Sequence, residues 1–240
     1  MGVLLGALIG NPAAAVAAAV VVALALSAGS YFYSARIALA MSQAQPAPVD
    51  EHPRYHNLVD GLCVAAGLPK PALYLIEDDA PNAFATGRSP EHAAVVVTTG
   101  LLEKLNRMEL EGVLAHELAH IRNHDILVTS IAVTMVGVVA RLSITAPLSA
   151  KLMQFAVSRR REALADFTGV RMTRYPPGLI SALEKLKNDR TVVHSGSRAT
   201  AHLWIESPLD REEGHKHARL NRMFDTHPPL EERIAALRDL

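Results

Sequence analysis

The stretch His116-Glu117-Leu118-Ala119-His120 decides how the rest of the chain is interpreted. Residues four apart on an α-helix lie one above the other, so a helix here brings both imidazoles to one point in space. Two neutral imidazole nitrogens are good zinc ligands, and Glu117, one position round the helix, can act as a base there without ligating the ion. The same motif arises by chance on amphipathic helices, so the zinc hypothesis needs further ligands.

A third protein ligand and an open fourth position are required at a catalytic zinc site. The candidate ligand is Glu162, in the segment SRRREALAD at residues 158–166. Glu162 and Asp166 are again four residues apart on an expected helix, so they share a face. Glu162 can then ligate the ion, while Asp166 accepts a hydrogen bond from a ligand histidine and fixes its tautomer. The small residues Ala163 and Ala165 allow this helix to pack closely against another.

Other assignments of these residues stay open at this point. Glu162 and Asp166 can be an exposed acidic pair that balances the charges of residues 159–161. His124, four residues beyond His120, is a conceivable alternative ligand. Each helical turn advances about 5.4 Å, however, which disfavours three histidines of one helix on one metal ion.

A further polar cluster is the segment THPPLEER at residues 226–233. His227 can be only a helix cap and Arg233 only a surface charge. Beside a zinc site, either residue can instead donate hydrogen bonds to a developing oxyanion. The last helix is expected to begin at Pro228 or Pro229, since proline suits the first helical turn, and to run to the end of the chain.

Around these motifs, the sequence predicts an α+β fold that is mostly α-helical with a small antiparallel β-sheet. Asn106 and Glu109 have the spacing of a capping box, so they are expected to open a helix that carries His116 and His120 and extends up to residue 140. Three strands are predicted from short β-branched runs separated by Pro, Gly and Asn, at residues 73–76, 82–86 and 93–98. Further helices are expected at residues 51–66, 151–171 and 177–187.

The charge balance and the cysteine content exclude some partners. Lys and Arg together number 24, as do Asp and Glu, so the formal net charge is zero and nucleic acid is not an expected partner. The single cysteine, Cys63, cannot form an internal disulfide. It is expected to be a half-buried apolar residue, compatible with a reducing compartment.

Residues 1–41 are expected to form a transmembrane anchor, followed by a second domain over residues 42–240. No charged residue occurs from Pro12 to Gly29, and this run is long enough to span a bilayer core. A cleaved signal peptide is the alternative, but no Lys or Arg precedes the apolar run. Because Arg36 and Arg54 follow the run, the positive-inside rule places the catalytic domain on the cytoplasmic side. The chain is then expected to be an integral protein of the cell membrane, that is, the inner or plasma membrane.

A second apolar stretch separates the two expected ligand helices. Residues 126–158 are mostly apolar, but they contain Pro147 and Lys151 and are too few for two complete spans, which need about forty residues. The sequence therefore predicts a short helical hairpin that dips into the membrane or packs on it. Burial of this hairpin within a soluble domain is the alternative.

Four motifs in the same order give the chain a resemblance to a known family. HELAHIRNHDIL, EALAD, NAFATG at residues 82–87 and THPPLEER together resemble the HtpX-like membrane zinc metalloproteases, a family that includes the CaaX-processing prenyl-protein endopeptidases. The resemblance covers about residues 57–240 and implies a zincin-like metalloprotease domain. It implies that Zn2+ is bound by His116, His120 and Glu162. The catalytic and supporting residues that it implies are Glu117, Asp166, His227 and Arg233.

The resemblance also implies how a substrate binds. The NAFATG segment matches an edge strand that pairs with extended polypeptide, which explains a preference for unfolded chains. The residues of this strand that are expected to bind substrate are Asn82, Ala83, Phe84, Ala85 and Thr86. One departure concerns the membrane: the family usually has two N-terminal spans and two more between the ligand helices, whereas only one N-terminal span is clear here.

The expected function is therefore that of a membrane-bound zinc endopeptidase that hydrolyses extended or misfolded (membrane) proteins in protein quality control. Its expected partners are polypeptide substrates and the lipid membrane. A non-catalytic zinc-binding membrane protein that binds polypeptides is the alternative. Glu117 disfavours that alternative, because a structural zinc site needs no base beside an open position. Prenyl-peptide processing is disfavoured because the chain has too little membrane helix for a chamber that accommodates lipid.

Overall fold

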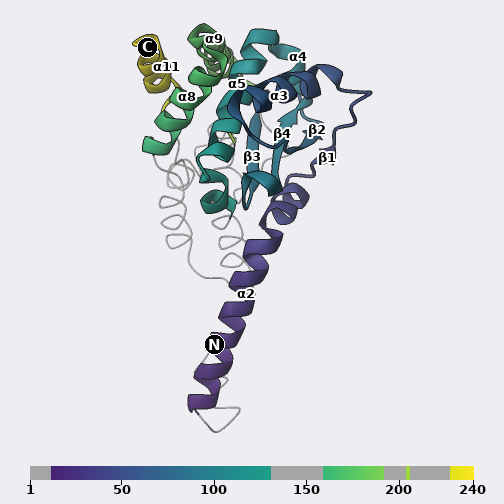
Figure 1. Cartoon of the computed structure of the whole chain (residues 1–240), viewed down its shortest axis with the longest axis vertical. Coiled ribbons are helices and arrows are strands. Elements are labelled where there is room, and N and C mark those ends of the chain that lie inside the picture. Colours follow the sequence, from purple (N-terminus) through teal and green to yellow (C-terminus); the bar gives the residue numbers. More distant parts are fainter. Residues whose placement is uncertain (1–11, 131–158, 192–203, 206–227) are drawn as a thin grey trace.

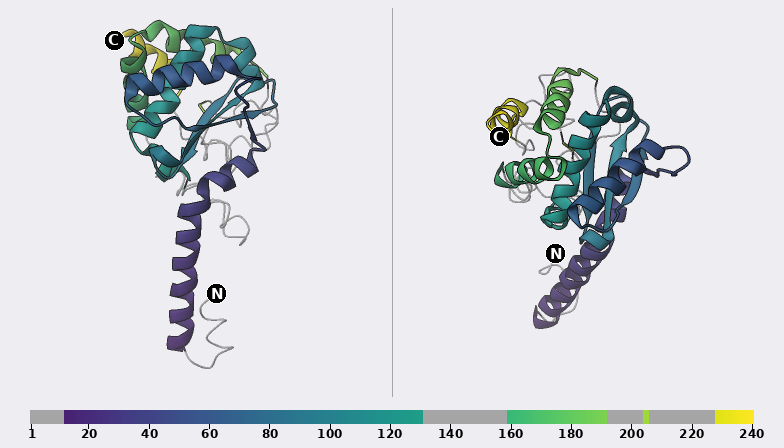
Figure 2. Two further views of the ribbon diagram at one scale, coloured as in Figure 1. Left: turned by 45° about the vertical axis from the view of Figure 1, so that its right-hand side comes forward. Right: turned by 45° about the horizontal axis from the view of Figure 1, so that its top comes forward.

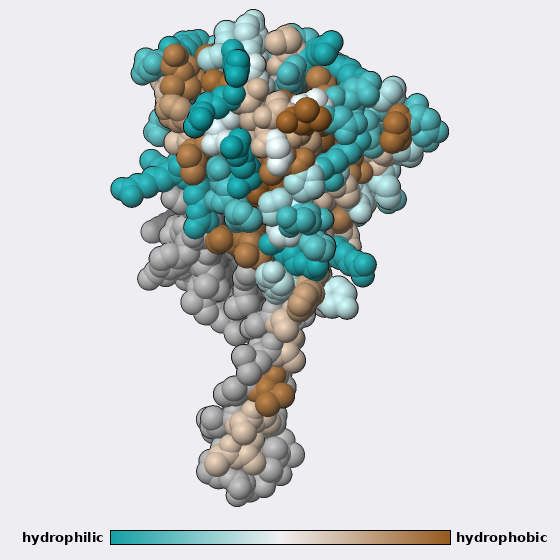
Figure 3. Space-filling view, in the orientation of Figure 1, coloured by the Kyte–Doolittle hydropathy of each residue, from teal (hydrophilic) through white to brown (hydrophobic). Residues whose placement is uncertain are grey.

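The computed structural model describes residues 12–130, 159–191, 204–205 and 228–240 (Figure 1). In this part of the chain, helices pack around a small sheet, and the long helix α2 (Pro12–Met41) projects away from them (Figures 1 and 2). On the face drawn in Figure 3, hydrophilic residues cover most of the helical body, whereas the described residues along α2 are largely apolar.

Within the described residues, four strands form one mixed sheet in the spatial order β1-β2-β4-β3. β1 (Gln45–Pro46) is antiparallel to β2 (Ala72–Ile76), and β3 (Ala83–Gly87) is antiparallel to β4 (Ala93–Thr98). β2 and β4 are parallel, so the prediction of an antiparallel sheet is wrong for this pair. The chain forms the edge strand first, as β3, and then returns as β4 between β3 and β2, which gives β4 the direction of β2.

The two strands β3 and β4 are buried along their whole length. Such strands are continuous apolar runs rather than alternating ones, because both faces of the sheet are covered. Val95 and Val97 of β4 enter the main hydrophobic core, while Val96 enters a second cluster on the other face. That second cluster consists of Ala38, Ile76, Ala80, Phe84, Val96 and Trp204, so the end of α2 packs against the sheet.

Helix α5 (Arg107–Arg122) carries the HELAH motif and lies at the centre of the helical layer. It packs against the strand β3 and against three helices, which are α3 (Pro53–Ala66), α8 (Arg159–Thr173) and α9 (Pro176–Asn188). Other helical elements in the part that the structure describes are η1 (Pro90–His92), α4 (Thr99–Lys104) and α11 (Leu230–Arg238). α11 packs on α8 and α9. It lies on the side of α8 that faces away from the sheet (Figure 1).

The predicted capping box opens α5. Asn106 Oδ1 accepts a hydrogen bond from Glu109 N at 3.0 Å, and Asn106 N donates to Glu109 Oε2 at 2.8 Å. The buried Glu109 carboxylate also accepts from Ser181 Oγ and Lys185 Nζ of α9, each at 2.7 Å. Glu109, the capping-box residue at the third position of α5, therefore also attaches this end of α5 to α9.

Two glycines allow close contacts between helix backbones. Gly112 lies where α5 meets α9, and Gly169 lies where α8 meets α5. A Cβ atom at Gly112 of α5 would lie 2.7 Å from Leu179 N of α9. A Cβ atom at Gly169 of α8 would lie 3.0 Å from His116 N of α5. The sequence pointed to Ala163 and Ala165 for the close approach of α8. Of these two, Ala165 is buried and Ala163 is exposed, so Gly169 is the residue that the contact requires.

The membrane segments expected from the sequence are described only in part. No helix within the described ranges combines the length and the apolar character needed to cross a membrane. Residues 12–41 of the expected anchor form α2. The hairpin expected at residues 126–158 lies outside the described residues from residue 131 onward.

We expect Gly169→Ala to lower the free energy of unfolding by about 1–3 kcal/mol, because the added methyl group overpacks a contact between two helix backbones. The matched control is Gly61→Ala, on the exposed side of α3, where a Cβ atom meets nothing within 4 Å. That variant should gain up to about 1 kcal/mol from helix propensity alone. Chemical unfolding of the purified protein, followed by circular dichroism, measures both. A stabilising effect of Gly169→Ala would contradict the tight contact between α5 and α8.

Candidate metal centre

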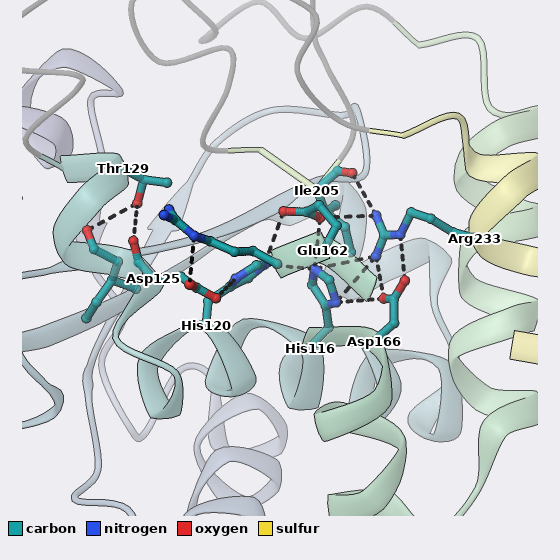
Figure 4. A network of polar contacts seen from close by, with 10 residues as sticks. His116, His120, Asp125, Thr129, Glu162, Asp166, Ile205 and Arg233 are labelled. Carbon is teal, nitrogen blue, oxygen red and sulfur yellow. Dashed lines mark hydrogen bonds and ion pairs between the residues drawn. The ribbon is translucent and has the colours of Figure 1, made fainter. Parts of the chain in front are cut away.

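Three side chains that can bind a metal ion converge between α5 and α8 (Figure 4). The ligand atoms of His116, His120 and Glu162 all lie within 4.8 Å of one another. The two Nε2 atoms are 3.1 Å apart, and the Glu162 oxygens lie 3.7 Å from His116 Nε2 and 3.6 Å from His120 Nε2. Two nitrogens bound tetrahedrally to one zinc ion are about 3.3 Å apart, so the spacing fits such an ion.

Each histidine is oriented by a carboxylate at its other ring nitrogen. His116 Nδ1 lies 2.8 Å from Asp166 Oδ1, and His120 Nδ1 lies 3.2 Å from Asp125 Oδ2. When Nδ1 carries the proton and donates a hydrogen bond to the carboxylate, Nε2 keeps its lone pair. Both lone pairs are then directed at the space that Glu162 also faces, as a metal site requires.

Asp125 is a site residue that the sequence reasoning did not identify. α5 ends at Arg122, and His124 has a φ of 60°, a left-handed conformation that turns the chain. This turn returns the Asp125 carboxylate to His120, although a spacing of five does not place two residues on one helix face. His124 itself is exposed and is not part of the metal-binding cluster, so the structure does not support it as an alternative ligand.

Arg233 of α11 holds Asp166 from the opposite side. Its Nε lies 2.9 Å from Asp166 Oδ2 and its Nη2 lies 2.7 Å from Oδ1, a bidentate ion pair. Burial favours a higher pKa for Asp166, but the charges of Arg233 and His116 outweigh it and hold this pKa well below its usual range. Asp166 is therefore an ionised carboxylate that can accept a hydrogen bond from His116 Nδ1–H.

The charges around His120 favour a cation at the cluster. Burial lowers the pKa of His120, but the Glu162 charge and the hydrogen bond to Asp125 outweigh it and raise the pKa to about 9. The surroundings therefore stabilise positive charge at this ring. A divalent cation that replaces the proton gains from the same carboxylates.

Glu117 is buried on α5 next to this cluster. Burial raises the pKa of its carboxyl group above the ordinary value, against the effect of His116 and His120, and the charge of Glu162 adds to the increase. The structure thus places a carboxyl group with a raised pKa beside the two histidines, where a general base would act.

The other residues expected in the site lie at its margins. Residues 83–86 belong to the edge strand β3, which packs against α5, and Asn82 directly precedes it. His227 lies outside the described residues, whereas Arg233 is buried beside His116 and Asp166. Ile205 is a further residue that the sequence reasoning did not identify, and its carbonyl oxygen accepts a hydrogen bond from Arg233 Nη1 at 3.4 Å.

Two histidines on one helix, a glutamate from a second helix and a buried glutamate beside them define the site of a metallopeptidase. The chain belongs to peptidase family M48, whose model matches residues 50–240. The protein is therefore a metalloprotease.

Curated relatives agree with this family. The chain is similar to proteins called "Protease HtpX homolog" from Tropheryma whipplei (strain Twist), Thermoanaerobacter pseudethanolicus and Syntrophobacter fumaroxidans, with identities of 42%, 41% and 43%. Each alignment covers 88% of this chain, and the alignments cover 80%, 80% and 85% of the relatives' own lengths, in that order. The resemblance to HtpX-like metalloproteases is confirmed.

We expect Asp125→Asn to weaken zinc binding by about tenfold or more, because the carboxylate that orients His120 becomes a neutral amide. The matched control is Asp79→Asn, which makes the same change at an exposed residue. Competition with a chromophoric zinc chelator measures both affinities. Equal zinc affinity of the two variants would show that Asp125 does not support the ligand.

Proposed function

We propose that this metalloprotease is a membrane-bound zinc endopeptidase that cleaves extended or misfolded polypeptides, membrane proteins included, in protein quality control. The observation that carries the proposal is the convergence of His116, His120 and Glu162 with Glu117 buried beside them. The similarity to proteins called HtpX protease homologues supports it further.

Zinc is the metal that this set of donors fits best. Two imidazole nitrogens and one carboxylate leave a fourth position open in a tetrahedral site, the arrangement of catalytic zinc. The ligands would be His116, His120 and Glu162, oriented through Asp166 and Asp125. When bound, zinc supplies Lewis acidity, which polarises the scissile carbonyl group and makes the attacking water more acidic.

Glu117 moves the proton in this reaction. It accepts one proton from the attacking water, whose oxygen forms the new bond to the carbonyl carbon. Glu117 then gives that proton to the amine nitrogen as the carbon–nitrogen bond breaks, so that the carboxylate is regenerated. Burial, which raises the pKa of Glu117, suits a group that must both accept and release a proton.

We assign different tasks to the two residues expected near the oxyanion. His227 is proposed to donate a hydrogen bond to the developing negative charge. Arg233 donates two short hydrogen bonds to Asp166, and its Nη2 atom lies 3.3 Å from His116 Nδ1. Arg233 is therefore proposed to position Asp166 and His116 rather than to contact the substrate.

The substrate class follows from the edge strand β3. Residues 82–86 are proposed to bind an extended polypeptide by strand addition, in which main-chain hydrogen bonds provide the affinity. Folded proteins do not present a free strand in this way, so unfolded and misfolded chains are the proposed substrates.

Attachment to the cell (inner/plasma) membrane is proposed through residues 1–41 and the segment at 126–158. Residues 12–29 lack charge, and the described part of α2 is largely apolar (Figure 3). Arg36 and Arg54 follow this run, which favours a catalytic domain on the cytoplasmic side.

We expect the purified protein to cleave casein, and we expect both zinc chelation and Glu117→Gln to abolish the cleavage. Glutamine keeps the size of the side chain but cannot accept the proton of water, so activity should fall by at least about a hundredfold while zinc stays bound. The zinc content of the variant is the control. If the wild type binds zinc and yet cuts no more than the variant does, the protein is not an endopeptidase for such substrates.

We expect the full-length chain to stay in the membrane pellet when cells that express it are washed with alkaline carbonate, because an apolar segment is removed from lipid only by detergent. A peripheral membrane protein that carbonate releases is the control. Recovery of the chain in the aqueous fraction would contradict the membrane anchor.

A further inference from the structure

In the described ranges of the chain, strand β3 ends the sheet and β4 is the strand that pairs with it. The direction of its main-chain groups alternates along an antiparallel pair. Thr98 N donates to Asn82 O at 3.0 Å, so Asn82 and every second residue after it direct their main-chain groups toward β4. The N–H and C=O groups of Ala83, Ala85 and Gly87 therefore point away from β4, toward the outer edge of β3.

At the two ends of β3, Ala83 and Gly87 already use outward main-chain groups in hydrogen bonds. Ala83 O accepts a hydrogen bond from Ile205 N at 3.0 Å, and Ala83 N donates to Asn82 Oδ1 at 3.0 Å. At the other end, Gly87 N donates to Ser130 Oγ at 3.1 Å. Ala85 lies between these positions, and no described residue forms a hydrogen bond to its outward main-chain groups.

Trp204 and Ile205 are firmly packed where they meet β3. Trp204 is completely buried and contacts Phe84 edge to face, with ring centroids 4.9 Å apart. Trp204 belongs to the second hydrophobic cluster and Ile205 to the main core, so the two side chains lie on opposite faces of the sheet, as in a strand. The Ile205 carbonyl accepts from Arg233 Nη1 at 3.4 Å, which ties this segment to the residue that holds Asp166.

We propose that Trp204–Ile205 is a fixed end wall of the substrate cleft, so that an extended substrate pairs with β3 through Ala85 alone. The inference rests on the proposed function, because it assigns the part of β3 that receives the polypeptide. A substrate residue opposite Ala85 donates its N–H to Ala85 O and accepts from Ala85 N. Substrate residues two positions away find Ala83 O and Gly87 N occupied.

This arrangement defines what the protease demands of its substrate. A single residue with two main-chain hydrogen bonds is enough for recognition, so the substrate needs to be extended only locally. A long strand cannot align with β3, since Ile205 and Ser130 bound the available edge. Short exposed segments of a damaged protein therefore suffice.

A peptide series with one methylated main-chain nitrogen in each member tests this pairing on the full-length protein. We expect methylation at one position, apart from the scissile amide, to lower kcat/KM by about tenfold, because one hydrogen bond is lost. Methylation two residues to either side should change kcat/KM by less than about threefold. Two sensitive positions spaced two residues apart, or none, would overturn the end wall. Failure to cleave the unmethylated peptide would instead refute the proposed function.

The variant Ile205→Pro removes the N–H that occupies Ala83 O. We expect a second sensitive position, two residues from the first, to appear in this variant. Ile205→Val, which keeps the N–H, is the matched control and should retain one sensitive position. A single sensitive position in a folded Ile205→Pro variant would overturn the proposal.

A spectroscopic measurement decides whether the wall is fixed even if Ile205→Pro does not fold. Trp204 is the only tryptophan of the chain, so its emission reports on this segment alone. We expect the emission maximum of the Glu117→Gln variant to stay at the same wavelength when the peptide saturates it. A shift to longer wavelength would show that the substrate displaces Trp204–Ile205 into water, which overturns a fixed wall.

Discussion

The contact between α5 and α8 at Gly169 sets the position of every group in the metal centre. Glu162, Asp166 and Gly169 are spaced i, i+4 and i+7, so all three lie on the face of α8 that meets α5. A Cβ atom at Gly169 would lie 3.0 Å from His116 N, and the two helices are therefore as close as their backbones allow. This closeness brings the short Glu162 and Asp166 side chains within reach of the histidine rings. Helix α11, which brings Arg233 to the site, then packs on α8 and α9.

Buried charges hold the rings in place once the helices have met. Asp166 is enclosed between His116 and Arg233, and Asp125 between His120 and Arg161, whose Nε lies 3.7 Å from Asp125 Oδ1. A charge that is removed from water needs its partners, because losing one of them leaves the other uncompensated in a medium of low dielectric constant. Arginine suits the position at 233 better than lysine, since the planar guanidinium binds both oxygens of Asp166 at once. These ion pairs fix the orientation of the two histidine rings. In this way they also influence how the site can bind a metal ion.

Local patterns in the sequence were enough to predict the parts of the fold that depend on local physics. The four-residue spacing in HELAH, the capping box at Asn106 and the β-branched run of β4 each correspond to an element in the structure. The parallel pairing of β2 and β4 was not predictable, because strand order depends on contacts between segments distant in the chain. Asp125 was missed because a left-handed residue at His124 sets its direction. Gly169 was missed because its importance depends on the backbone that it faces. The proposed roles of the site residues stay predictions.

The metal centre depends on residues that are far apart in the chain, and this distance governs when it can form. His116 and Arg233 are separated by 117 positions, and Asp166 and Arg233 by 67. Contacts of such long range form late, since closing a large loop costs entropy before any contact rewards it. A half-folded chain can already contain the helix with both histidines while Asp166 still lacks Arg233. Such an intermediate lacks the Arg233 contact that holds Asp166 beside His116. The surroundings of His116 are therefore completed only when α11, near the end of the chain, has packed on α8.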